Sequence, residues 1–357
     1  MLPKAHKQPN YRLLETGSLL FRETIPRVLK HFDIQTIDSI SESISEAVEK
    51  KGLRFAAAQA FAVGPPEMGQ SSRVEPHPIA TDELAAAYLL EYAGRLAALV
   101  GPWVKSDAHE GNHQSEAVHV LESLLRTARL WNVELVQAVI DDDSPFDVDA
   151  LRRAGLSKLA KLYQMKIEFS AIEGLQENLQ YEHQAHCDRS TPKVWRRYDL
   201  SDYSAWIDWM ESTYIGTTDC PELNGVRTTS ETFAGYLASS GVKIGEMDKP
   251  EWWALFDQEN GLASSKARQP KIAAAFLLGH STSGFWELSY MGVAPEFRGQ
   301  GLGNATLQQA LWIAQSNNVQ QLWLAVDDRN LNAIRLYQRN GFEVTRALEA
   351  WFLAIDP

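Results

Sequence analysis

The chain has 357 residues, of which 45% are hydrophobic and 22% are charged, so its composition is that of a folded protein and its length suggests two domains. Its net charge of −12 argues against nucleic acid as a partner and suits a cationic or amine-bearing small molecule better. No apolar run approaches the roughly 20 residues of a membrane helix, no signal-peptide core is present and only two cysteines occur, so we expect a cytoplasmic protein without a membrane partner.

The two halves of the chain share one pattern of helix, strand and turn. In the first half, the pair Asp141-Asp142 precedes a short predicted helix and then Gly155, and Asp327-Asp328 and Gly341 repeat this order. The offset is the same at both points, since 341 − 155 and 327 − 141 are both 186. Applied without gaps, the offset aligns Leu121, Leu125, Ala128, Asn132 and Val133 with Leu307, Leu311, Ala314, Asn318 and Val319. We interpret the chain as two copies of one αβ unit, although any helix–strand–helix segment resembles another.

A polar segment near 170–195 joins the two copies. It contains His183, His186, Cys187 and Asp188, which are metal-ligand types, but no second ligand pair follows at a suitable spacing. We therefore expect surface residues and no metal. The predicted boundaries are 1–170 for the first domain, 171–194 for the linker and 195–357 for the second domain.

An acidic loop follows the first predicted helix of the second domain. Asp219 and Glu222 lie in this loop, which ends at Gly225. Their charges would attract an amine cation. An ordinary turn with solvated charges is the alternative.

The last third of the chain gives the clearest succession of elements. Apolar runs at 271–278 and 285–293 flank turn residues and predict a β-hairpin. The remaining predicted elements are a helix from about 305 that ends near 317–318, a buried strand at 321–326, a helix at 332–340 and a final strand region at 342–355.

A glycine-rich loop lies between the predicted hairpin and the helix that follows it. Its sequence runs Arg298-Gly299-Gln300-Gly301-Leu302-Gly303. Backbone N–H groups in such a loop point into one concavity, and the helix adds its positive end, so an anion with several oxygens is favoured. Gly301 and Gly303 carry no side chain that would hold a diphosphate away from the amides. By itself, such a loop can also be a plain turn.

The two motifs of this region together resemble the GNAT acyltransferase superfamily. The loop matches the family's diphosphate-binding pattern at Arg298, Gly301 and Gly303, and the preceding segment 293–297 is similar to the family's strand end. The later family motif is matched at Asn330, Ala333, Leu336, Tyr337, Gly341 and Phe342.

The resemblance implies an α/β (α+β) fold with a mixed, mostly antiparallel sheet flanked by helices. The sheet would splay between a fourth strand at 288–293 and a fifth at 321–326, and the pantetheine arm of acetyl-CoA would lie in the splay. Backbone groups near Met291 and Val293 would pair with the pantetheine amides and hold the thioester carbonyl. The implied cofactor-binding residues are Met291, Val293, Arg298, Gly299, Gln300, Gly301, Gly303, Asn304, Asn330 and Ala333.

Direct acyl transfer to an amine requires a base for the ammonium proton and a proton donor for the leaving thiolate. Tyr337 occupies the family's position for the general acid, although it could instead only pack on the cofactor. Glu287 is the first candidate for the base, because it lies on the fourth strand as does the catalytic glutamate of some family members. The alternative is a strand residue that faces solvent.

The first copy lacks these features. The offset aligns the loop with Asn112 to Ala117, places Glu116 where phosphate would bind, and aligns Tyr337 with Leu151. We therefore expect a degenerate first domain, in a tandem arrangement similar to that of mycothiol synthase. The expected function is transfer of an acetyl group from acetyl-CoA to an amine by a monomer or homodimer, and the alternative is a non-catalytic acyl-CoA-binding or sensing protein.

Overall fold

The structure is a computed structural model, and it describes residues 10–15, 48, 54–61, 83–92, 94–104, 113–141, 146–169, 193–240, 250–257, 271–280 and 285–355. The chain forms two compact units, of which unit 1 comprises residues 1–159 and 350–357 and unit 2 comprises residues 160–349. This division differs from the predicted one at both ends of the second domain. The cause is the strand pairing, because residues 162–168 pair with residues 321–327 of unit 2, whereas the end of the last strand belongs to unit 1. Most of the predicted linker, with its four possible metal ligands, lies outside the described residues.

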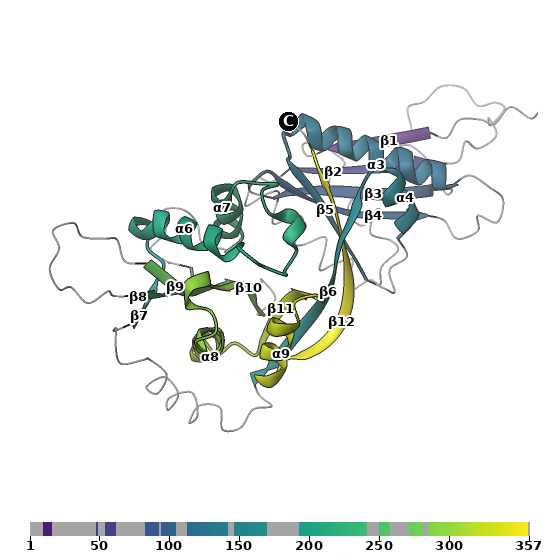
Figure 1. Cartoon of the computed structure of the whole chain (residues 1–357). Coiled ribbons are helices and arrows are strands. Elements are labelled where there is room, and N and C mark those ends of the chain that lie inside the picture. Colours follow the sequence, from purple (N-terminus) through teal and green to yellow (C-terminus); the bar gives the residue numbers. More distant parts are fainter. Residues whose placement is uncertain are drawn as a thin grey trace, which may run out of the picture. The chain divides into compact units, whose positions relative to one another are not determined.

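Unit 1 is a sheet covered by a long helix. Its sheet order is β1-β2-β3-β4-β5, followed by the end of β12, and α3 lies over one face of this sheet (Figure 1). Its elements are β1 (Asn10–Glu15), β2 (Phe55–Phe61), β3 (Glu83–Tyr92), β4 (Leu96–Val104), α3 (His113–Leu130), β5 (Leu135–Asp141) and α4 (Val148–Arg153).

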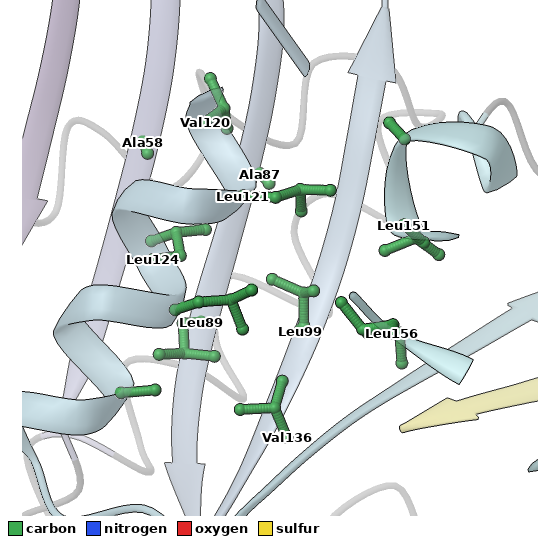
Figure 2. Close-up of a cluster of buried hydrophobic side chains, with 14 of the residues drawn as sticks. Ala58, Ala87, Leu89, Leu99, Val120, Leu121, Leu124, Val136, Leu151 and Leu156 are labelled. Atoms are coloured by element: carbon green, nitrogen blue, oxygen red, sulfur yellow. The ribbon is translucent and has the colours of Figure 1, made fainter. Parts of the chain in front are cut away.

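The core of unit 1 follows the alternation of its strands. Ala87 and Leu89 of β3 point toward Leu121 and Leu124 of α3 in one buried cluster (Figure 2). Tyr88 between them belongs to a second cluster on the opposite face of the sheet. Apolar residues on both faces explain why β3 is an almost continuous apolar run.

Unit 2 has the sheet order β12-β6-β11-β10-β9-β8-β7. The β10–β11 pair is parallel, whereas the pairs of β11 with β6, β10 with β9, β9 with β8 and β8 with β7 are antiparallel. Its elements are β6 (Ser157–Glu168), β7 (Lys193–Arg197), η2 (Leu200–Asp202), α6 (Tyr203–Thr213), η3 (Pro221–Leu223), α7 (Thr229–Ser239), β8 (Trp252–Asp257), β9 (Lys271–His280), β10 (Trp286–Val293), η4 (Pro295–Phe297), α8 (Leu302–Ser316), β11 (Gln321–Asp327), α9 (Leu331–Arg339) and β12 (Glu343–Ala354). The predicted hairpin and the four elements after it are confirmed, as is the mixed, mostly antiparallel sheet.

Helices cover both faces of the sheet in unit 2. Ala275 and Leu277 of β9 pack in a cluster with Trp206 of α6, whereas Phe276 and Leu278 pack with residues of α8. In Figure 1, α6 and α7 lie on one side of β9 and β10, and α8 lies on the other. None of the helices in the described part of the chain is both long and apolar enough to cross a bilayer.

The internal repeat is confirmed by local geometry. Strands β5 and β11 differ by 186 at both ends, as do the last residues of α3 and α8. Asn132 and Asn318 share a φ of 57°, and Gly155 and Gly341 have φ values of 96° and 89°. Each asparagine ends a long helix in the left-handed region, which Asn tolerates better than most residues do. The two units are thus copies of one fold.

Candidate active site

Strands β10 and β11 separate soon after they begin. Their pairing ends at Glu287 opposite Trp323, whereas β10 remains paired with β9 as far as Val293. From Leu288 onward, the edge of β10 that faces away from β9 has no partner among the described strands. This confirms the predicted splay. It leaves backbone groups near Met291 and Val293 accessible to an extended ligand that can hydrogen-bond like a strand.

A β-bulge re-aims the side chains of β10. The register against β9 shifts between Leu288 and Tyr290, which makes Ser289 an extra residue. Gly279 on β9 provides the space, because a Cβ there would lie 2.9 Å from the Ser289 hydroxyl oxygen. After the bulge, Tyr290 packs with the α6 cluster and Met291 with the α8 cluster. The motifs did not reveal this bulge, and Gly279 in an otherwise apolar strand was its one sequence signal.

The glycine loop presents an uncapped helix end. Gly299 and Gly301 have φ values of 75° and 78°, and a Cβ at either would meet no atom within 4 Å. The first N–H groups to donate back are those of Asn304 and Ala305, both to the Gly301 carbonyl at 3.1 and 3.2 Å. Among the described residues, the N–H groups from Gly299 to Gly303 have no backbone acceptor, and Gly301 provides no side-chain cap. Such a group of donors at a helix N-terminus suits a diphosphate.

The Arg298 side chain turns away from the loop that it begins. Its guanidinium donates to three backbone carbonyls, those of Val293 (3.1 Å), Ile215 (2.7 Å) and Thr213 (3.0 Å). Gln300 likewise donates its side-chain amide to a backbone carbonyl of the preceding turn, at 3.1 Å. Two residues predicted to bind the cofactor thus use their side chains to shape the loop.

The predicted residues Asn304, Asn330 and Ala333 hold α9 in place. Asn304 Oδ1 accepts from the side chain of Asn340 at the end of α9 (3.1 Å). Asn330 is the N-cap of α9, and its Oδ1 accepts from the N–H of Ala333 (3.2 Å). Their positions set where Tyr337 lies relative to the loop.

Tyr337 is buried on α9, with its ring 5.7 Å from that of Phe342. No hydrogen bond to its hydroxyl is formed by the described residues. Burial raises the pKa of the Tyr337 phenol well above its ordinary value, and the negative charge of Asp219 adds to this effect. Tyr337 is therefore protonated at neutral pH and has a proton to donate.

Glu287 lies at the last paired position before the strands separate. Its side chain reaches solvent, yet enough protein surrounds the carboxylate that desolvation raises its pKa. In the described part of the chain, no ion pair or hydrogen bond engages this carboxylate. A base must combine access with a raised pKa, and Glu287 has both.

Aromatic residues of α6 and α7 gather beside β10. The Tyr290 hydroxyl lies 2.6 Å from the Thr213 hydroxyl, and its ring is 5.7 Å from Trp209 and 5.8 Å from Tyr236. The sequence motifs did not indicate Thr213, Trp209 or Tyr236, because no spacing pattern links residues of three separate elements.

The acidic loop is fastened to the junction of β11 and α9. The Cys220 N–H donates to buried Asp327 (3.0 Å), and the Asp327 N–H donates to the Asp219 carboxylate (3.1 Å). Arg329 then bridges Asp327 and Glu222, with one contact of 2.6 Å to each. Of the two acidic side chains predicted to attract an amine, Glu222 is thus neutralised and Asp219 is not ion-paired in the described structure.

Asp219, Cys220 and Asp327 also bring three possible metal-ligand atoms within 4.8 Å of one another. The charge of Asp327 is, however, already balanced by Arg329. Burial, together with the charge of Asp219, raises the pKa of the Cys220 thiol to about 12, so the thiol is protonated at neutral pH. The arrangement is that of a structural clamp.

The corresponding helix start in unit 1 is built differently. Helix α3 already begins at His113, which the offset aligns with Gly299, so helix replaces the loop. Glu116 lies in this first turn, and it is buried with one carboxylate oxygen that has no partner among the described residues. An acidic residue in the first turn interacts favourably with the helix dipole and opposes the binding of an external anion there.

The splay of unit 1 is covered by the unit's own chain. Strand β4 pairs with β5 only from Leu96 to Ala98, so the strands also separate. Here Trp103 forms a bridge with Phe146, with ring centroids 5.1 Å apart, and the Asp147 N–H donates to the carbonyl of residue 102 (2.9 Å). The chain after β5 thus occupies the edge that is open in unit 2.

The glycine loop and the later motif with Tyr337 both lie in the part of the chain that matches a known protein family. Residues 177–342 match the model of the Acetyltransferase (GNAT) family. This part of the chain thus carries the GNAT family pattern. A GNAT assignment explains the joint presence of the loop, the splay and the buried tyrosine.

Two curated acetyltransferases match parts of the chain. An uncharacterized N-acetyltransferase of Methanocaldococcus jannaschii is 34% identical over 67 residues, which are 18% of this chain and 29% of that protein. A mycothiol acetyltransferase of Corynebacterium aurimucosum is 26% identical over 142 residues, which are 36% of this chain and 45% of that protein. The chain thus spans less than half the length of either relative.

One solved structure extends the similarity in fold to most of the chain. A glucosamine N-acetyltransferase region of a fungal multi-domain β-N-acetylglucosaminidase matches 97% of this chain and 38% of its own, with a TM-score of 0.58 and 10% identity. A tandem GNAT protein from the clavulanic acid biosynthesis pathway matches 85% of this chain and 83% of its own, with a TM-score of 0.48 and 11% identity. At such identities, the first match shows the fold alone.

Proposed function

We propose that this GNAT protein transfers an acetyl group from acetyl-CoA directly to a primary amine. The observation that carries the proposal is the joint placement of three features in unit 2. The uncapped start of α8 suits a diphosphate, the open edge of β10 suits pantetheine, and the Tyr337 hydroxyl has no protein partner in the described structure. A protein that only bound the anion would not need a buried phenol of this kind.

Glu287, the backbone amides of β10 and Tyr337 each have a separate role in the proposed transfer. The acceptor nitrogen loses a proton to Glu287, directly or through water, and attacks the thioester carbonyl carbon. Backbone N–H groups of β10 stabilise the oxyanion, and the carbon–sulfur bond then breaks. Tyr337 protonates the departing thiolate, and the phenolate so formed takes the second proton from the amide nitrogen, directly or through water, so the products are a neutral amide and CoA. Asp219 and Glu287 favour an acceptor that arrives as a cation.

The proposal is tested by measuring thiol release from acetyl-CoA. The acceptors would be an alkylamine, a polyamine, an amino sugar, an amino acid and a peptide amine, each offered to the wild type and to Tyr337→Phe. We expect amine-dependent release by the wild type and a loss of about 10²-fold in kcat for the variant, with CoA affinity retained. Tyr163→Phe, on β6, is the matched control. CoA binding without amine-dependent release would instead support a sensing protein.

A further inference from the structure

Arg298 connects three segments that are far apart in the sequence. The residue itself belongs to the glycine loop, and its side chain reaches the end of β10 at Val293 and the end of α6 at Thr213 and Ile215. All three contacts are hydrogen bonds to main-chain oxygens. A guanidinium suits this task because its N–H donors lie in a fixed planar fork.

The end of α6 needs these donors. The last carbonyls of a helix have no partner within the helix, and a cation there also interacts favourably with the helix dipole. Thr213 is the last residue of α6, and Ile215 lies two residues beyond it. The Arg298 fork therefore caps α6 from a loop 83 to 85 residues further along the chain.

The same end of α6 packs directly on β10. A Cβ at Gly292 would lie 2.7 Å from the Thr213 methyl group and 3.2 Å from the Trp209 ring, so the absence of a side chain permits the contact. Thr213 also holds the Tyr290 hydroxyl at 2.6 Å. A displacement of the end of α6 would thus move Tyr290 and the aromatic group beside β10.

We propose that Arg298 is a positioning residue that couples occupancy of the cofactor loop to the order of α6. Binding of the diphosphate fixes the loop backbone, and this in turn fixes the position of the Arg298 Cα from which the side chain extends. The side chain then holds the end of α6, and with it Thr213 and Tyr290, in the arrangement that receives the acceptor. This inference rests on the proposed function, because it requires that CoA binds the loop.

The test is hydrogen–deuterium exchange of peptides covering residues 203–217, with and without CoA, in the full-length protein. In the wild type, we expect CoA to slow exchange there about fivefold or more. Arg298→Lys keeps the positive charge but loses the planar fork. We therefore expect this variant to bind CoA with an unchanged dependence of affinity on salt, and to lose the effect of CoA on α6. Arg335→Lys, an exposed residue of α9, is the matched control.

Two other outcomes would refute the coupling alone, and a third would refute the proposed function as well. If Arg298→Lys raises exchange equally with and without CoA, the residue only stabilises α6 and the coupling is refuted. If Arg298→Ala weakens CoA binding and lowers its salt dependence, the side chain is a phosphate ligand and the inference is also refuted. If the wild type binds no CoA, the proposed function falls together with the inference. The first two outcomes leave the proposed function intact.

Discussion

Glu287 combines two properties that oppose each other in a folded protein. Its carboxylate is accessible but partly desolvated, so its pKa is raised above the ordinary value for Glu. Folding therefore favours the protonated form, and the stability of the protein decreases as pH rises from the unfolded pKa through the folded one. A carboxylate that costs stability at neutral pH is expected where catalysis requires a base.

The pH dependence of catalysis tests this role. Because the base must be ionised, we expect kcat/KM of the wild type to fall as pH drops through the raised pKa of Glu287. Glu287→Gln should lose about 10²-fold at neutral pH and recover part of it at high pH, where the free amine is abundant. The same variant should be no less stable than the wild type at pH 7.

The comparison variant is Glu343→Gln, which removes an exposed carboxylate from β12 and should leave the profile unchanged. If Glu287→Gln keeps the acidic limb of the wild-type profile, another group is the base. Asp219 would then be the next candidate.

At the scale of single residues, the motifs located the site but did not assign every side chain. Tyr337 and the glycines matched the family pattern, and in the structure they lie on α9 and at the start of α8. Arg298 and Asn304 were also predicted to bind the cofactor. In the structure, the Arg298 side chain donates to three backbone carbonyls, and the Asn304 side chain accepts from Asn340. A sequence does not show which distant carbonyl a helix end leaves without a partner, so such roles require the structure.

The clamp on the acidic loop acts at the scale of whole elements. Asp327 is fully buried. Burial opposes its charged form, but hydrogen bonds from Arg329 and from the Cys220 N–H outweigh this effect and lower the pKa of Asp327. A lowered pKa contributes stability above the unfolded pKa, and this contribution is lost as pH falls through the folded pKa. The loop before α7 should thus loosen in acid before the rest of unit 2.

Asp327→Asn should destabilise the protein by about 2 kcal/mol in urea unfolding at pH 7. This value is below that of a fully buried pair, because the Arg329 side chain is 43% exposed. The difference from wild type should shrink in strong acid. Asp328→Asn changes the neighbouring, less buried carboxylate and should cost little. Equal losses for the two variants at pH 7 would show that the clamp does not contribute to stability.

The helices and strands of the last third of the chain were predicted well, but the unit to which β6 and the end of β12 belong was not. Turn residues bounded the hairpin, and the helical spacing of Ala305 to Ala314 located α8. The division near 170 placed all of β6 with the first domain, although the strand from Ala160 onward belongs to unit 2. Alternation shows which face of a strand is buried, not which strand it pairs with. The pairing of β6 with β11 is set by tertiary contacts.

At the scale of the whole molecule, two copies of one fold are expected to provide one cofactor site. In unit 1, helix replaces the glycine loop, the charge of Glu116 occupies the helix start, and the Trp103–Phe146 bridge covers the splay. Leu151, buried at the position equivalent to Tyr337, has no proton to donate. Any one of these changes would weaken acyl-CoA binding or catalysis, so we expect the described part of unit 1 to hold neither the diphosphate nor the pantetheine and to supply no acid.

Calorimetry with CoA should therefore give one site per chain. Gly301→Val should abolish all binding, because a β-branched residue is strained at a φ of 78° and the loop backbone would leave the conformation that presents its N–H groups. Gly155→Val introduces the same kind of strain in unit 1, at a φ of 96°, and should retain one site. Residual binding by Gly301→Val with a stoichiometry of one would mean that unit 1 holds a second site. The bridge between Trp103 and Phe146 would then have to open in solution, since it lies along the edge that pantetheine would need.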